Sequence, residues 1–251
     1  MKTVPQYLPI GFAMVRIAAR QRFFTLFCLL GILLLNGCAT TKHYASVSKL
    51  ARSTVGTKIV LMPLDVELSI LTAGGVLEPN AEWTQAAQAY MNSAITAFQR
   101  QHNLEFFPYK RPELSDSEYA ELIDLERLHG AVGQAILFHK YQVPLSTKKD
   151  VFDWTLGATA VVLKQRTGAD YALFIHVRDS YSSAGRVFVQ MAAAVLGVGV
   201  QGGQQIGFAS LVDLNTGDII WFNYLFSGTG DLRTEQPATK TVEVLLEGFP
   251  T

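Results

Sequence analysis

Cysteine and recognisable catalytic motifs are both scarce in this chain. Of 251 residues only two are cysteine, Cys28 and Cys38. The histidines do not show the His-Glu-x-x-His spacing of zinc hydrolases, and no Gly-x-Ser-x-Gly nucleophile elbow is present. His129 and His139, ten residues apart, are too far apart to share a metal on a straight helix. We therefore expect no catalytic residue, no metal and no cofactor, and we expect that the protein is not an enzyme.

Acidic residues are missing from the start of the chain, and so is an apolar run of membrane-spanning length. Before residue 23 the only charged residues are basic. They are Lys2, Arg16, Arg20 and Arg22. The apolar run that follows, Phe23 to Leu35, is shorter than the roughly 20 residues of a transmembrane helix. This order is typical of a secretory signal peptide, with Met1 or Met14 as its start.

The apolar run stops at the sequence Leu35, Asn36, Gly37, Cys38. This pattern resembles the site that the signal peptidase of bacterial lipoproteins recognises. A cysteine is needed there because its thiol takes up a diacylglyceryl group, after which the freed amine can be acylated, for example with palmitate. Two or three acyl chains anchor a protein stably. We expect Cys38 to be the lipid-bearing mature amino terminus; an ordinary cut or an uncleaved anchor is the alternative.

Removal of residues 1–37 would change the composition of the protein. It leaves 214 of the 251 residues, which is enough for one compact domain. The basic residues fall from 21 to 17 against 21 acidic ones, a balance that argues against nucleic acid binding. Ala39, rather than Asp, follows Cys38 and resembles a sorting signal for the outer membrane. The expected location is the periplasmic face of the outer membrane.

The mature chain divides by composition into a linker and a globular domain. Residues 38–57 are small and polar and predict a flexible tether; residues 58–251 predict the domain. Strands are expected at 58–66, with Pro63 marking an edge or bulge, at 104–110 and at 170–177. A hairpin is expected to turn at Asn215 to Gly217.

Helices are expected between these strands. One follows the cap residue Asn80 and ends near Gln101, and a second begins at Ser115, with Gly130 and Gly133 as points where it could kink. A third would run over 154–166, capped by Asp153 and closed by Gly168, and a fourth follows Pro237. The prediction is a single α/β domain, a mixed sheet of about five strands packed with four helices.

An uncharged apolar stretch, Val187 to Val200, interrupts this pattern. Its glycines Gly197, Gly199 and Gly202 spell Gly-x-Gly-x-x-Gly, but no helix follows them, so a dinucleotide site is not expected. We favour burial of this stretch inside the fold over a membrane-contacting loop or a self-association surface. The candidate self-association residues are Val187, Phe188, Val189, Met191, Val195 and Leu196.

Three carboxylates near the first strand, Asp65, Glu67 and Glu78, offer a weak alternative site. Ligands of open α/β sheets bind at the carboxyl ends of strands. A small molecule or a cation could bind there, but we favour the interpretation that these are solvated loop carboxylates.

The hairpin sequence GFASLVDLNTGDIIWFN, residues 207–223, carries a family resemblance. It looks like the paired strands of the curli-secretion (CsgG-like) and penicillin-binding-protein-activator lipoproteins, whose domain is similar to the amino-terminal domain of TolB. The chain also contains the segments KIVLMPL, RTGADYALFI and LLEGFP, which occur along the sequence in the same order as in that family. The resemblance implies a periplasmic α/β domain, tethered to the outer membrane, that binds proteins or assembles and uses no cofactor.

These observations lead to three hypotheses for function. The first is a lipid-anchored, non-enzymatic envelope lipoprotein that binds or assembles periplasmic or outer-membrane proteins. The second is a homo-oligomeric ring or a subunit of a secretion complex that buries Val187 to Val200. The third is a periplasmic small-ligand-binding protein or hydrolase that uses the region of Asp65.

Overall fold

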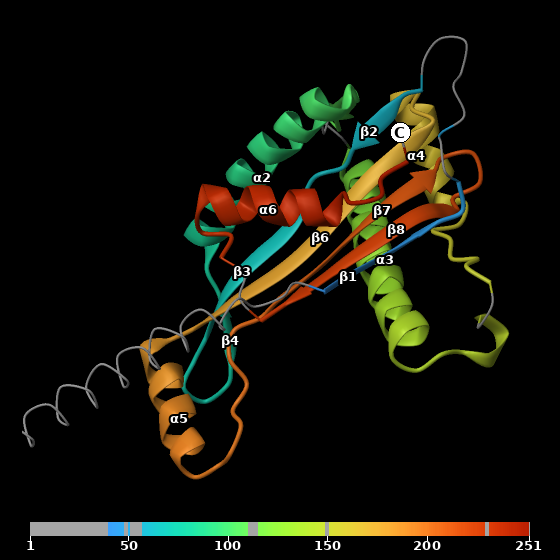
Figure 1. The fold of residues 1–251 in the computed structure, drawn as a ribbon. Coiled ribbons are helices and arrows are strands. Elements are labelled where there is room, and N and C mark those ends of the chain that lie inside the picture. The colour runs from blue at the N-terminus through green and yellow to red at the C-terminus, as the bar shows by residue number, and fades with distance from the viewer. Residues whose placement is uncertain are drawn as a thin grey trace, which may run out of the picture. The chain divides into compact units, whose positions relative to one another are not determined.

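A single mixed β-sheet with helices on both faces forms the body of the molecule (Figure 1). The computed structural model describes residues 40–47, 50, 57–109, 115–148, 151–228 and 231–250, all within one compact unit, Ala39–Thr251. The predicted α/β class is confirmed. Within the described residues the sheet has eight strands rather than about five, and five α-helices accompany it rather than four.

The strands are β1 (Thr40–Ala45), β2 (Ile59–Leu61), β3 (Asp65–Leu71), β4 (Leu77–Pro79), β5 (Phe106–Pro108), β6 (Tyr171–Ser182), β7 (Gln205–Asp213) and β8 (Ile219–Ser227). The helices are α2 (Ala81–His102), α3 (Asp116–Tyr141), α4 (Thr159–Thr167), α5 (Ala184–Val195) and α6 (Glu235–Leu245), with a short 3₁₀ turn at Ser146–Lys148.

The central strand is β6, which is longer than its predicted range of 170–177. It pairs antiparallel with β7 along one side and parallel with both β2 and β3 along the other. Between β2 and β3 the chain has one residue more than β6 opposite it, since Leu61 pairs with Leu173 and Asp65 with His176. This bulge contains Pro63, which cannot donate to the ladder, as its sequence position predicted.

The first described segment corrects the expectation for the tether. Residues 38–57 were predicted to be flexible, but Thr40–Ala45 form β1, which pairs antiparallel with β8. The sequence did not predict this strand because residues 40–45 show no alternating apolar pattern. The segment becomes a strand by pairing with β8. β1 therefore begins two residues after Cys38, at the end of the sheet where β8 finishes.

Helices α2 and α6 cover one face of the sheet (Figure 1). The Asn80 side chain accepts a hydrogen bond from the Trp83 amide at the start of α2, which confirms the predicted cap. The predicted fourth helix is α6, and its expected apolar face is buried. The shared core includes Leu68, Ala87, Met91, Ile95, Phe98, Leu173, Ile175, Leu211, Trp221, Val242, Leu245 and Phe249.

Helices α3 and α4 supply the core on the opposite face, with Met62, Leu122, Ile136, Leu163, Phe174, Phe208 and Phe222. α3 runs through Gly130 and Gly133 without ending. α4 begins at Thr159 rather than Trp154, so the predicted cap by Asp153 is wrong. Residues 154–156 instead pair with the hairpin turn: the Leu156 amide donates to the Gly217 carbonyl at 2.8 Å. Gly168 ends α4 in the left-handed conformation, as predicted.

The β7–β8 hairpin matches its prediction closely. Its turn includes Gly217 at a φ of 84°, and a Cβ at this residue would lie 2.2 Å from the Gly157 carbonyl oxygen. Only glycine fits both the backbone angle and the close approach. The short strand expected near 104–110 is β5, which pairs in parallel with β2.

Candidate functional site

The sequence predicted three sets of site residues: the lipoprotein-processing residues, the candidate self-association residues and the carboxylates near Asp65. Leu35, Asn36, Gly37 and Cys38 lie outside the described residues. The candidate self-association residues lie on and just beyond α5, which connects β6 to β7 and has no buried residue. The favoured prediction, that Val187 to Val200 are buried inside the fold, is therefore wrong. Hydropathy alone did not show that this segment leaves the sheet.

We call residues 183–204 the arm. α5 turns its polar side inward: Arg186 donates from Nε and Nη2 to the Gln201 carbonyl at 3.0 and 2.8 Å, and Gln190 donates to the Val200 carbonyl at 3.3 Å. Phe188, Met191 and Val195 follow at helical spacing on the other side. Their exposed fractions are 68%, 59% and 87%. The arm is thus held together by polar contacts and presents an apolar row to its surroundings.

The Gly-x-Gly-x-x-Gly stretch has a structural use in the arm. Gly197 takes a φ of 74° just after α5. A Cβ on Gly202 would lie 2.8 Å from Gln190 Nε2, and one on Gly203 would lie 2.1 Å from the Ser180 carbonyl oxygen. Since a helix precedes these glycines and a strand follows them, the arrangement is the reverse of a dinucleotide site.

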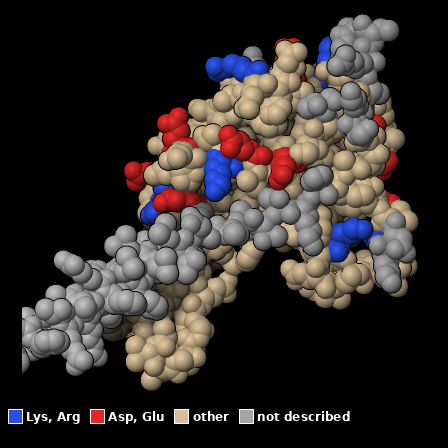
Figure 2. All heavy atoms as spheres, viewed as in Figure 1, with Lys and Arg blue, Asp and Glu red and all other residues tan. Residues whose placement is uncertain are grey.

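Other exposed apolar residues lie at the same end of the sheet. The β3–β4 turn is beside the arm, because the Ser183 amide donates to the Leu71 carbonyl at 2.9 Å and Arg186 Nη1 reaches the Ala73 carbonyl at 3.5 Å. Val76 in this turn and Leu77 at the start of β4 are both exposed. No Lys, Arg, Asp or Glu is visible on the face of the arm that Figure 2 shows.

A buried polar network fixes the base of the arm to the segment before α6. Asp179 Oδ2 accepts hydrogen bonds from the Tyr181 hydroxyl, from Gln205 Nε2 at 3.2 Å and from the Leu232 amide at 3.1 Å. Burial raises the pKa of Asp179 above its ordinary value, although these donors oppose the shift. The network makes the position of the arm depend on specific contacts in the body.

Replacing Tyr181 with phenylalanine should lower the free energy of unfolding by about 1–3 kcal/mol. The hydroxyl donates to Asp179 and accepts from the Leu232 amide at 2.7 Å, so its loss removes one of the hydrogen bonds that each group makes. The loss should be larger at neutral than at acidic pH, because protonation of Asp179 removes the buried charge. Urea unfolding measures the effect. Tyr90→Phe, on a half-buried tyrosine of α2, is the control; an equal loss there would contradict the prediction.

The three carboxylates considered as a ligand site do not lie on one face of the sheet: Asp65 and Glu67, two residues apart on β3, share a face to which Glu78 does not belong. Asp65 begins β3 and is not at the carboxyl end of a strand; its Oδ2 lies 2.7 Å from His176 Nδ1 and its Oδ1 lies 2.7 Å from Arg178 Nη2. Burial raises the pKa of Asp65, but these two partners outweigh it and the pKa is lowered. Glu78 is opposite Ile70 in the β3–β4 register and therefore belongs to the other face of the sheet. In the described part of the chain no three His, Cys, Asp or Glu residues form a potential metal site.

A buried histidine and serine form a pair that the sequence did not predict. His129 Nε2 lies 3.0 Å from Ser210 Oγ, and the His129 ring stacks on Phe174 at 4.5 Å between centroids. Burial lowers the pKa of His129 to about 3. Both side chains are inside the core between α3 and the sheet, so a substrate cannot reach them and the pair has a structural role.

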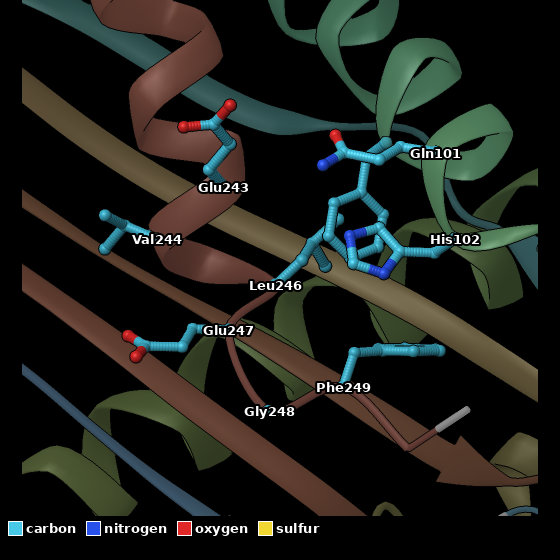
Figure 3. A pocket seen from close by; sticks show the side chains of 9 residues that line it. Gln101, His102, Glu243, Val244, Leu246, Glu247, Gly248 and Phe249 are labelled. Atoms are coloured by element: carbon cyan, nitrogen blue, oxygen red, sulfur yellow. The ribbon is translucent and has the colours of Figure 1, made fainter.

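A surface groove of about 620 Å³ lies between the ends of α2 and α6 (Figure 3). Figure 3 shows Gln101 pointing from α2 toward Glu243 on α6, and His102 pointing toward Leu246. Phe98, Leu246 and Phe249 supply apolar lining, and Glu243 and Glu247 supply carboxylates. The sequence placed these residues on the two predicted helices, but their approach depends on how α2 and α6 pack.

No helix among the described residues combines the length and apolar character needed to cross a membrane. Comparison with protein-family models found no match, and comparison with curated proteins likewise found none. Among solved structures, the PelC dodecamer from Paraburkholderia phytofirmans and a single-residue variant of that dodecamer are each similar at 12% identity, with TM-scores of 0.40 and 0.38. The matches cover 84% of this chain and 96% and 97% of the PelC chains. At these values the similarity is too distant to assign the chain to a family or to a function.

Proposed function

We propose that this protein is a lipid-anchored, non-enzymatic lipoprotein of the bacterial outer membrane that binds partner proteins at the periplasmic face. Its lipid would be attached to Cys38 after cleavage behind Leu35, Asn36 and Gly37. The observation that carries the proposal is the position of β1. The two residues from Cys38 to the start of β1 span at most roughly 7 Å. A lipid on Cys38 would therefore hold the sheet close to the bilayer.

The groove between α2 and α6 is the proposed binding site for the partner. Its apolar lining suits an apolar side chain, and Glu243 and Glu247 add negative charge at its border. Charge complementarity therefore points to a partner segment in which an apolar residue lies next to Lys or Arg. The buried His129 and Ser210, and the ion-paired Asp65, serve the fold instead of supplying a reactive group.

Replacing Cys38 with alanine should abolish both palmitate labelling and recovery of the protein in the membrane fraction. The thiol of Cys38 is the proposed acceptor of the diacylglyceryl group, so no other residue can take its place. Cys28→Ala is the matched control, because Cys28 would leave with the signal peptide, and it should remain labelled. A palmitate-labelled Cys38→Ala protein would overturn the lipid anchor.

The partner site is tested with a photo-crosslinking residue at Gln101, on the groove. Crosslinks to a partner should be at least tenfold weaker after charge reversal by Glu243→Lys with Glu247→Lys, and they should persist after Glu105→Lys, which changes an exposed glutamate beside β5. Crosslinking that is unaffected by the double reversal would contradict the groove as the partner site.

A further inference from the structure

We infer that the arm is a second membrane contact: the apolar row of α5 lies in the same bilayer surface that the lipid on Cys38 enters. This inference rests on the proposed lipid anchor, and it identifies the bilayer as the surface that the arm contacts. It leaves partner binding to the body of the domain.

The sheet register places the start of β1 and the arm at one end of the molecule. Thr40 pairs with Phe226 of β8, and Phe226 pairs in turn with Ile206 of β7. Gln205, the first residue of β7, directly follows the arm and pairs with Asp179 near the end of β6. β1 thus begins, two residues after Cys38 in the sequence, at the same end of the sheet that carries α5 (Figure 1).

Exposed apolar side chains also gather at this end. Besides the row on α5, the loop after it exposes Leu196 and Val198, and the β3–β4 turn and the start of β4 expose Val76 and Leu77. Phe226, the partner of Thr40, is 46% exposed. The surface of a bilayer could therefore contact the arm and the neighbouring β3–β4 turn at once and also accept the lipid. A groove on a single partner protein would contact only some of these groups.

The charge of the arm fits a bilayer surface. Between Arg186 and Asp213 the sequence has no charged residue, and Arg186 itself is bound to the Gln201 carbonyl on the inner side of the arm. An apolar helix face of this kind enters the boundary between headgroups and acyl chains, typically by about 5–10 Å. Because the apolar row itself has no basic residue and Arg186 is bound to the Gln201 carbonyl, the contact should need neither anionic lipid nor low salt.

The experiment uses the lipidated mature protein with a single new cysteine. If Cys38 carries lipid and Cys28 has been removed, a thiol-reactive environment-sensitive dye labels only the introduced residue. Phe188→Cys places the dye on α5. Phe138→Cys places it on α3, on another exposed phenylalanine. Each labelled protein is reconstituted in phosphatidylcholine vesicles, with or without lipids brominated on their acyl chains.

Emission of the dye at residue 188 should shift to the blue on reconstitution, and brominated lipid should quench it at least twofold. The dye at residue 138 should show neither effect, and 0.5 M salt should change neither result. Adding Phe188→Asp and Met191→Asp to a protein labelled through Val195→Cys should remove the quenching while the lipid keeps the protein on the vesicles. Because α5 buries no residue, these changes leave the core intact.

Three outcomes overturn the inference. A dye at residue 188 that stays in water on the vesicles shows that the arm does not enter the bilayer. A blue shift that needs no vesicles, rises with protein concentration and resists brominated lipid assigns the row to a second copy of the chain. Retained quenching in the aspartate variant shows that the apolar row is not the contact. Failure of the lipid anchor is recognised separately, because the protein without an introduced cysteine would then take up dye at Cys38.

Discussion

Gly133→Ala should lower the free energy of unfolding by about 2–3 kcal/mol, although alanine is the better helix former. A Cβ at residue 133 would lie 2.0 Å from Phe208 Cε2, far inside any allowed contact. Phe208 cannot turn away, because its ring stacks on His176 at 4.6 Å and on Phe222 at 5.6 Å between centroids. The helix would have to move off the sheet, and this loses packing along α3.

Gly130→Ala is the matched control in the same helix. Its Cβ would meet His176 Nδ1 at 3.7 Å and Asp65 Oδ2 at 4.0 Å, which are ordinary contacts. It should gain up to about 1 kcal/mol from helix propensity. Urea unfolding of both variants gives the two values, and Phe208→Leu should recover part of the loss in Gly133→Ala. Equal effects at residues 130 and 133 would show that the close approach of α3 to the sheet is not what requires glycine.

His129→Gln should remove much of the acid sensitivity of the domain. The pKa of His129 is about 3 in the folded state, against an ordinary value of 6.5. Between these two pH values the unfolded chain therefore binds a proton at His129 and the folded chain does not. This residue stabilises the fold fully above pH 6.5, and its contribution is lost as the pH falls from 6.5 toward 3. The slope reaches about 1.4 kcal/mol per pH unit.

The physical cause is the burial of His129 between Phe174 and Phe208, where an imidazolium would lose its hydration. The neighbouring His176 opposes protonation of His129 further, and the carboxylate of Asp65 offsets part of the shift. Glutamine can still bond to Ser210 but does not titrate. Unfolding free energies from pH 7.5 down to 4.5 should therefore fall less steeply for His129→Gln than for the parent protein. His139→Gln, near the end of α3, should keep the parent slope. If the slopes of His129→Gln and the parent agree, His129 is not the acid-sensitive group.

Local sequence was sufficient to predict a structural element where the interactions that form the element lie within one short segment. The Asn80 cap bonds three residues ahead of itself to Trp83, and Gly168 ends α4 through its own backbone angle. The Asn215 to Gly217 turn lies between two apolar strands that it joins directly, so periodicity and turn residues together predicted β7 and β8. The bulge at Pro63 was predictable for the same reason, since the missing amide is a property of that residue.

Segments whose structure depends on distant partners were predicted poorly. β1 is polar and exists because β8 offers an unpaired edge, and residues 154–156 are extended because the turn at Gly217 bonds to them. The arm was predicted to be buried because its residues are apolar, yet apolar side chains are buried only where the chain finds a surface to cover them. The pairing of His129 with Ser210, 81 residues apart, had no sequence signal at all.

The sequence by itself determined the local elements of this protein: the amphipathic helices, the caps, the hairpin turn and the α/β class that follows from their order. Only the tertiary structure decided that Gly133 lets α3 approach Phe208, that His129 is held neutral in the core, and that the apolar arm and the start of β1 share one end of the sheet. The physical reason is the distance along the chain over which each kind of interaction acts. Backbone angles and caps act over a few residues, whereas burial, close approach and strand pairing join residues that are neighbours only after folding.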